Sequence, residues 1–165
     1  MFTKNIIEQF KTSREDKILE VGNREFKRFL IDKAHDISID YTKKENLSAE
    51  LLTVKMRYSG PAEGTDELSR IAGLICERIT YLSENFKLIE LDRHNNKVQI
   101  RSAPPYHRES LIYYFEIILD LNRMSLQLQR LAYDSEDRSL EPVPFVISYD
   151  LLERLMRDLF DLAEL

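Results

Sequence analysis

The loop at residues 101–108 carries the side chains best suited to bind an anion. It reads Arg-Ser-Ala-Pro-Pro-Tyr-His-Arg. Guanidinium groups bind carboxylates and phosphates through paired hydrogen bonds, and consecutive prolines stiffen the chain between them. Protonation of the histidine near a pH of about 6.5 would add a positive charge. We therefore expect an anion-binding pocket formed by Arg101, Tyr106, His107 and Arg108.

The same loop also fits an ordinary connection between strands, in which the two prolines blunt a sheet edge. On either reading both arginines are expected at the surface. Their removal should then change the free energy of unfolding by less than about 1 kcal/mol, the usual range for surface substitutions.

Metal-binding and catalytic patterns are missing from the sequence. The histidines at positions 35, 94 and 107 form neither a His-x-x-x-His nor a His-Glu-x-x-His pair. The acidic run at 134–139 lacks the central glycine of a calcium-binding loop. Cys76, the single cysteine, belongs to an apolar stripe, where an inert thiol is expected. The sequence predicts no metal, no cofactor and no catalytic residue.

Acidic residues exceed basic ones, and they concentrate at the C-terminal end. The chain has 24 Lys and Arg against 29 Asp and Glu, a formal net charge of −5. An acidic surface repels phosphate backbones and anionic lipids, so no nucleic-acid partner is expected. The longest uninterrupted apolar run, Leu111–Phe115, is far too short to cross a membrane. We expect no membrane partner and a cytoplasmic location, because no signal peptide is evident.

The N-terminal part of the sequence predicts a helix followed by strands. Apolar residues at helical spacing predict a helix over about 2–13. Residues 17–34 fit either strands or a helix, and we favour strands. Alternation of apolar and polar residues predicts half-buried strands over 37–41 and 52–59.

The C-terminal part predicts a helix, four strands and a last helix. Thr65 is a good N-cap for a middle helix, whose apolar stripe runs from Leu68 to Leu82. Four strands follow, and Pro142 and Pro144 are expected to end the sheet. The expected strands are 87–92, 97–102, 111–121 and 124–133.

The last helix, expected over 149–162, has two apolar rows. One row contains four leucines, and the other contains Leu152, Met156 and Phe160. Two rows are wider than one sheet face covers. The second row is therefore either core in a deeply buried helix or an interface with a second subunit or a client. We expect the interface, and hence a homodimer.

These elements predict a single α+β domain over residues 1–165. Its mainly antiparallel, twisted sheet contains a four-strand C-terminal meander, and about three helices (N-terminal, middle and C-terminal) pack on the sheet. No motif identifies a family, but the order of elements resembles that of the secretion-chaperone type of small α+β dimer. This resemblance implies that extended client segments bind on the sheet surface.

We therefore expect a non-enzymatic protein-binding or adaptor domain, chaperone-like and homodimeric, with a protein client as partner. The alternative is a small-molecule-binding or enzymatic α+β domain with an anion-binding pocket near residues 101–108. A deep closed pocket would favour the alternative, and a flat apolar groove beside an open sheet edge would favour the first.

Overall fold

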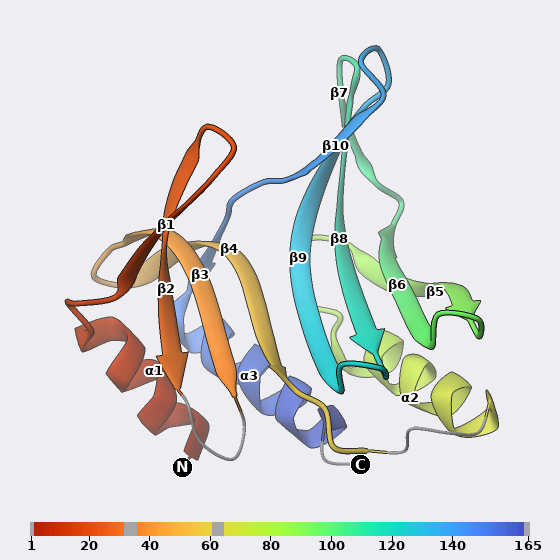
Figure 1. Cartoon of the computed structure of the whole chain (residues 1–165), viewed down its shortest axis with the longest axis horizontal. Coiled ribbons are helices and arrows are strands. Elements are labelled where there is room, and N and C mark those ends of the chain that lie inside the picture. Colours follow the sequence, from red (N-terminus) through yellow and green to blue (C-terminus); the bar gives the residue numbers. More distant parts are fainter. Residues whose placement is uncertain (1, 32–35, 61–64, 164–165) are drawn as a thin grey trace.

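Three helices and one antiparallel sheet make up the described part of the chain (Figure 1). The structure is a computed structural model, and it describes residues 2–31, 36–60 and 65–163. The helices are α1 (Phe2–Thr12), α2 (Thr65–Arg78) and α3 (Tyr149–Ala163). The predicted α+β class is confirmed. None of the described helices is long and apolar enough to cross a membrane.

The sheet of the described residues has eleven strands. They are β1 (Lys17–Val21), β2 (Arg24–Ile31), β3 (Ile37–Lys44), β4 (Ser48–Arg57), β5 (Asn85–Asp92), β6 (Lys97–Ala103), β7 (Tyr106–Arg108), β8 (Leu111–Asp120), β9 (Ser125–Asp134), β10 (Ser139–Pro142) and β11 (Phe145–Ser148). Their order is β1-β2-β3-β4-β9-β8-β6-β5, and in addition β10 pairs with β9, β11 with β4 and β7 with β8. The pairing of β4 with β9 thus joins the N-terminal strands to the C-terminal ones.

The helices lie against one face of the sheet and bury its apolar side chains. On β8, Phe115, Ile117 and Leu119 are at most 4% exposed, and they alternate with residues of the opposite face. The ring of Phe10 in α1 lies 5.4 Å from that of Phe29 in β2. We call the other side of the sheet, which none of the three helices covers, the open face (Figure 1).

Residues 17–31 form a β-hairpin, as favoured from the sequence. Val21 pairs with Arg24, so Gly22 and Asn23 make a two-residue turn. Gly22 has a φ of +62°, which glycine adopts without steric cost. The rest of the ambiguous segment, residues 32–35 with His35, lies outside the described residues.

Both apolar rows of α3 belong to the core of a single chain. Leu152 and Met156 are 0% exposed and Phe160 is 7% exposed. The row is covered because α1 and α2 pack against α3 in addition to the sheet, and the rings of Phe2 and Phe160 lie 5.2 Å apart. The row therefore needs no second subunit to cover it. The homodimer stays a prediction, but this row no longer supports it.

The prolines at 142 and 144 do not end the sheet, so that expectation is wrong. β10 runs through Pro142, and β11 pairs with β4 after Pro144. Pro142 is tolerated because it is the last residue of a short edge strand, where the missing N–H leaves no ladder bond open.

Candidate functional site

One row of side chains crosses the open face through six neighbouring strands. The backbone register places each member directly opposite the next, from β2 to β6. This row, which we call the polar row, consists of Arg28, Asp40, Thr53, Gln129, Glu116 and Arg101. The open face is thus assembled from segments that are far apart in the sequence.

Arg28 and Asp40 form the first ion pair of the polar row. The Arg28 guanidinium donates to both carboxylate oxygens of Asp40, over 2.7 and 3.0 Å. This two-bonded geometry is the strong form of an arginine–carboxylate contact. The hydrogen bond from Arg28 and its charge compensate a carboxylate that is only 7% exposed, and the contact raises the pKa of Arg28.

Glu116 is the second buried carboxylate of the polar row, and it is only 4% exposed. Arg101 Nε and Gln129 Nε2 each donate to one of its oxygens over 3.2 Å. The Arg101 guanidinium also stacks 5.0 Å from the centre of the Tyr114 ring, whose burial raises the pKa of its hydroxyl. The Arg101 guanidinium therefore already has partners within the chain, Glu116 and the Tyr114 ring.

A polar hollow lies beside Arg28 and Asp40. Its volume is about 250 Å³, and Ser38, Thr53, Lys55 and Gln127 also line it. Lys55 of β4 is flanked by Ser38 of β3 on one side and by Gln127 of β9 on the other. The hollow thus presents an ammonium, two hydroxyls and an amide side by side.

Two further hollows lie on the open face, and both contain more apolar side chains. The hairpin hollow, about 520 Å³, lies between the β1–β2 turn and β10, where Val21, Phe26, Leu52 and Pro142 line it. It meets the polar hollow at Asp40 and Thr53. Arg24 Nη1 donates to the Pro142 carbonyl over 3.1 Å, which ties the hairpin to the end of β10.

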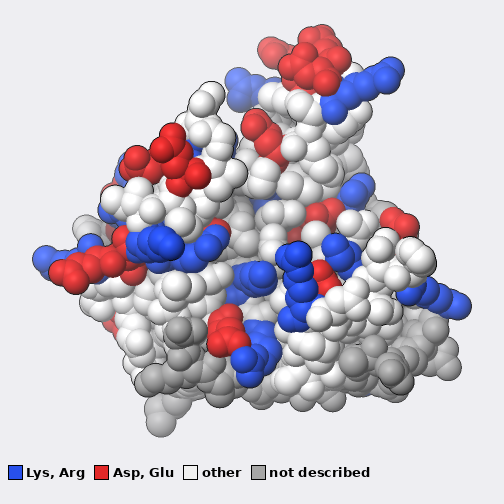
Figure 2. Space-filling model, in the orientation of Figure 1, with Lys and Arg blue, Asp and Glu red and all other residues white. Residues whose placement is uncertain are grey.

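The aromatic hollow, about 540 Å³, is the second of these two hollows. Ile112, Tyr114, Tyr133 and Leu140 line it together with Arg101. The space-filling view shows the face hollowed between the β1–β2 hairpin and the arm that carries β7 and β10 (Figure 2). The hairpin hollow and the aromatic hollow thus lie toward the end of the face that borders β10, and the polar hollow lies toward the opposite end of β4 and β9, at Lys55 and Gln127. We call this hollowed part of the open face the trough.

The structure does not bring the four residues expected at loop 101–108 into one pocket. Arg101 is opposite Glu116 on the open face. Tyr106 is opposite Tyr113, on the side of the sheet that faces the helices, where it lines a 210 Å³ hollow with Arg108. His107 is exposed, and it lines neither this hollow nor the aromatic one.

The contact of Arg101 with Glu116 bears on the expectation that removing the two arginines hardly changes the free energy of unfolding. Its removal would leave Glu116 buried with Gln129 as the remaining donor. A buried carboxylate that loses its cation is costly. Arg101 is therefore a structural residue of the open face, whereas Arg108 is exposed.

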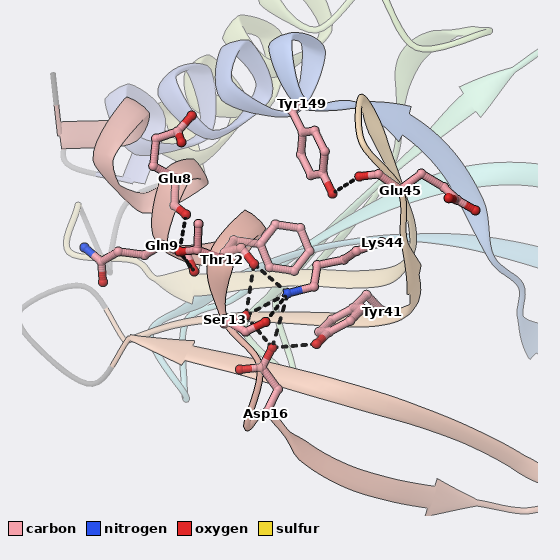
Figure 3. A network of polar contacts seen from close by, with 10 residues as sticks. Glu8, Gln9, Thr12, Ser13, Asp16, Tyr41, Lys44, Glu45 and Tyr149 are labelled. Carbon is pink, nitrogen blue, oxygen red and sulfur yellow. Dashed lines mark hydrogen bonds and ion pairs between the residues drawn. The ribbon is translucent and has the colours of Figure 1, made fainter.

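A second polar cluster, on the helix side of the sheet, joins α1 to β3 (Figure 3). Lys44 Nζ donates to the Phe10 carbonyl over 2.7 Å, to the Ser13 carbonyl over 2.6 Å and to Ser13 Oγ over 2.9 Å. Tyr41 donates its hydroxyl proton to Asp16 over 2.5 Å. Burial lowers the pKa of Lys44, and burial together with Asp16 raises the pKa of Tyr41 well above its usual range.

This cluster anchors the fold and is not a reaction centre. A catalytic lysine needs a lone pair or a donor directed at a substrate, whereas the three donors of this ammonium are directed at Phe10 and Ser13. A cation at the last carbonyls of a helix also compensates the helix dipole. Lys44 therefore fixes the end of α1 on the sheet.

The comparisons with known proteins identify no relative. No family model matches the chain, and comparison with curated proteins and with solved structures gives no match. Within residues 2–31, 36–60 and 65–163, no group of three or more His, Cys, Asp or Glu is arranged to hold a metal ion.

The trough contains residues that the sequence did not single out, above all Lys55, Gln127 and Leu140. The alternation along residues 52–59 predicts a polar side for that strand, and Lys55 is on it. It does not show which strand lies next to it. Only the register of β4 with β9 places Gln127 beside Lys55.

Proposed function

We propose that this protein is a non-enzymatic protein-binding domain, of the adaptor or chaperone type, which holds a segment of a partner in the trough of its open face. One observation carries the proposal: two adjoining hollows and a third, the aromatic hollow, lie on a sheet face that no helix of the described residues covers. Side chains of a partner can enter the two apolar hollows, which is how buried anchors contribute most of the affinity at protein interfaces.

Exposed apolar side chains beside the trough support the same function. Val21 is 68% exposed and Leu140 is 53% exposed, and each lines one apolar hollow. Apolar groups gathered around one groove mark interaction sites more often than isolated ones do. The proposal keeps the cytoplasmic location and the homodimer expected from the sequence.

Site-specific photo-crosslinking in the cells that make the protein tests this function. A photoreactive amino acid in place of Gln127 samples the trough, and the same substitution at Gln9, exposed on α1, is the matched control. We expect a second polypeptide to be cross-linked from position 127 and not from position 9. Cross-linking from both positions, or from neither, would contradict the proposal.

A small-molecule-binding domain is the second candidate, and the aromatic hollow favours it. Its 540 Å³ is large enough for a drug-sized ligand, and Tyr114 and Tyr133 could stack on a flat ring. Native mass spectrometry of the protein from its own cells separates the two candidates. A small ligand that disappears in Tyr133→Ala would favour this second function over the first.

A further inference from the structure

We propose that the partner segment is acidic, and that Lys55 in the polar hollow binds one of its carboxylates. The inference rests on the proposed function and adds the chemistry of the partner. It depends on three observations: the state of Lys55, the donors around it and the charge of the open face.

Lys55 is the one cation of the polar hollow that has no counter-ion among the described residues. The other two charged groups there, Arg28 and Asp40, bind each other through two hydrogen bonds. Among the described residues, no carboxylate lies within ion-pair distance of Lys55. The side chain is half-buried. A half-buried ammonium is partly dehydrated, so a carboxylate that reaches it gains more than it would at an exposed lysine.

Further donors surround the ammonium. Ser38 and Thr53 have hydroxyls that line the hollow and make no side-chain hydrogen bond to another described residue. Gln127 completes the lining from β9. A carboxylate has two oxygens with about four lone-pair sites, and it can accept from the ammonium and from a hydroxyl at once. The 250 Å³ of the hollow is enough for the end of a Glu or Asp side chain.

The open face is more basic than the chain as a whole. On β2, β3, β4, β8, β9 and β6 its basic side chains are Arg24, Arg28, Lys55, Arg57, Lys97 and Arg101, and its acidic ones are Asp40, Glu50, Glu116 and Asp120. Lys and Arg gather over the middle of the face, whereas a group of acidic side chains lies at the tip of the β9–β10 arm (Figure 2). A basic groove in a protein of net charge −5 attracts acidic groups to that groove.

An acidic peptide fits the distribution of charge on the open face better than a nucleic acid does. Asp40, Glu50, Glu116 and Asp120 interrupt the basic residues of the face, and Glu136 and Asp137 are exposed in the turn between β9 and β10. A phosphate backbone would meet these carboxylates along its length. A peptide can instead place a single carboxylate at Lys55 and an apolar side chain in the hairpin hollow, which adjoins the polar hollow at Asp40 and Thr53.

The test is an array of short synthetic peptides with equal apolar content, in which the same positions hold Glu, Gln or Lys. We expect the folded wild-type protein to bind the Glu series about tenfold more tightly than the Gln series, the effect of one charge-assisted hydrogen bond. Lys55→Gln should remove this preference, and Lys55→Glu should reverse it in favour of the Lys series. Raising the salt concentration should weaken the binding of the Glu series most.

Lys4→Glu is the matched control, because it makes the same charge change on the exposed side of α1. It should keep the preference for Glu peptides, and circular dichroism should show that both variants are folded. A preference that survives in Lys55→Glu, or one that Lys4→Glu abolishes equally, would overturn the role of Lys55.

The remaining outcomes separate this inference from the proposed function. Equal binding of all three series, if weakened by Leu140→Arg in the aromatic hollow, would overturn the acidic preference and leave the proposed function standing. Binding of no peptide would overturn both. If a single-stranded DNA probe binds more tightly than any peptide, the partner is a nucleic acid and not an acidic peptide. If a peptide copied from residues 134–141 of this chain binds most tightly, the partner is a second copy of the chain.

Discussion

The ammonium of Lys44 donates a 2.7 Å hydrogen bond to the carbonyl of Phe10, in the last turn of α1. The same ammonium lies 5.2 Å from the centre of the Phe10 ring and 5.1 Å from that of Tyr41. One side chain thus satisfies carbonyls at the end of a helix and covers two aromatic rings of the core. The helix and strand β3 are joined through it.

We predict that Lys44→Met lowers the free energy of unfolding by about 2–4 kcal/mol, because charged hydrogen bonds at the end of α1 are lost and Asp16 loses its nearest cation. Urea denaturation followed by circular dichroism measures the change. Lys43→Met is the matched control, since Lys43 is exposed and its ion pair with Glu45 lies at the surface. An equal loss in both variants would show that Lys44 has no special role.

Arg101→Ala should lower the free energy of unfolding by about 1–3 kcal/mol, because buried Glu116 loses its cation. Arg108→Ala should change it by less than about 0.5 kcal/mol, as exposed residues do. The double variant Arg101→Met with Glu116→Met should be more stable than Arg101→Ala, since no buried charge is left. Thermal unfolding of the three variants beside the wild type checks this. If Arg101→Ala is as stable as the wild type, the prediction is refuted.

Met156→Glu should disrupt the fold of the chain rather than separate two subunits. Met156 is 0% exposed within one chain, and an unpaired carboxylate cannot be buried there without a large cost. We expect loss of the cooperative thermal transition. A folded variant whose mass by light scattering falls from about twice 19.6 kDa to 19.6 kDa would instead place this row in a dimer interface.

Stability should decrease with rising pH above about pH 10, and Tyr81 should contribute to the decrease. Burial first, and then its 2.7 Å hydrogen bond to Asp158, raise the pKa of Tyr81 above its ordinary value. The folded state therefore keeps a proton that the unfolded chain loses above pH 10 or so, and the stabilising contribution is complete below that pH. Tyr81→Phe should make the alkaline slope shallower in urea titrations at a series of pH values. An unchanged slope would count against this contribution.

Local patterns predict the helices well because each helix has a complete amphipathic signal. The rows of α3 and the stripe of α2 can be identified from spacing alone, and the cap at Thr65 marks where α2 begins. Residues 17–31 are ambiguous from local patterns, because Phe26 and Phe29 also fit helical spacing. The Gly22-Asn23 turn is the signal in the sequence that indicates the hairpin.

The candidate site could not be predicted in the same way, because it depends on register. Arg101 and Arg108 are near in sequence, but the pairing of Tyr106 with Tyr113 sets β7 so that Arg108 is on the side of the sheet opposite to Arg101. Lys55 and Gln127 are far apart in sequence, and yet they are opposite each other. Which residues lie opposite each other depends on the pairing of all the strands, so no single segment of the sequence predicts it.

The position of β4 has a consequence for how the chain is made. β4 pairs with β3 on one side and with β9 and β11 on the other, and these last two strands lie near the C-terminal end of the sequence. During synthesis, an edge of β4 therefore stays without its partners until most of the chain has left the ribosome. An unpaired strand edge is a template for association with other chains. The incomplete chain, in which this edge of β4 is still unpaired, is thus prone to associate with other chains.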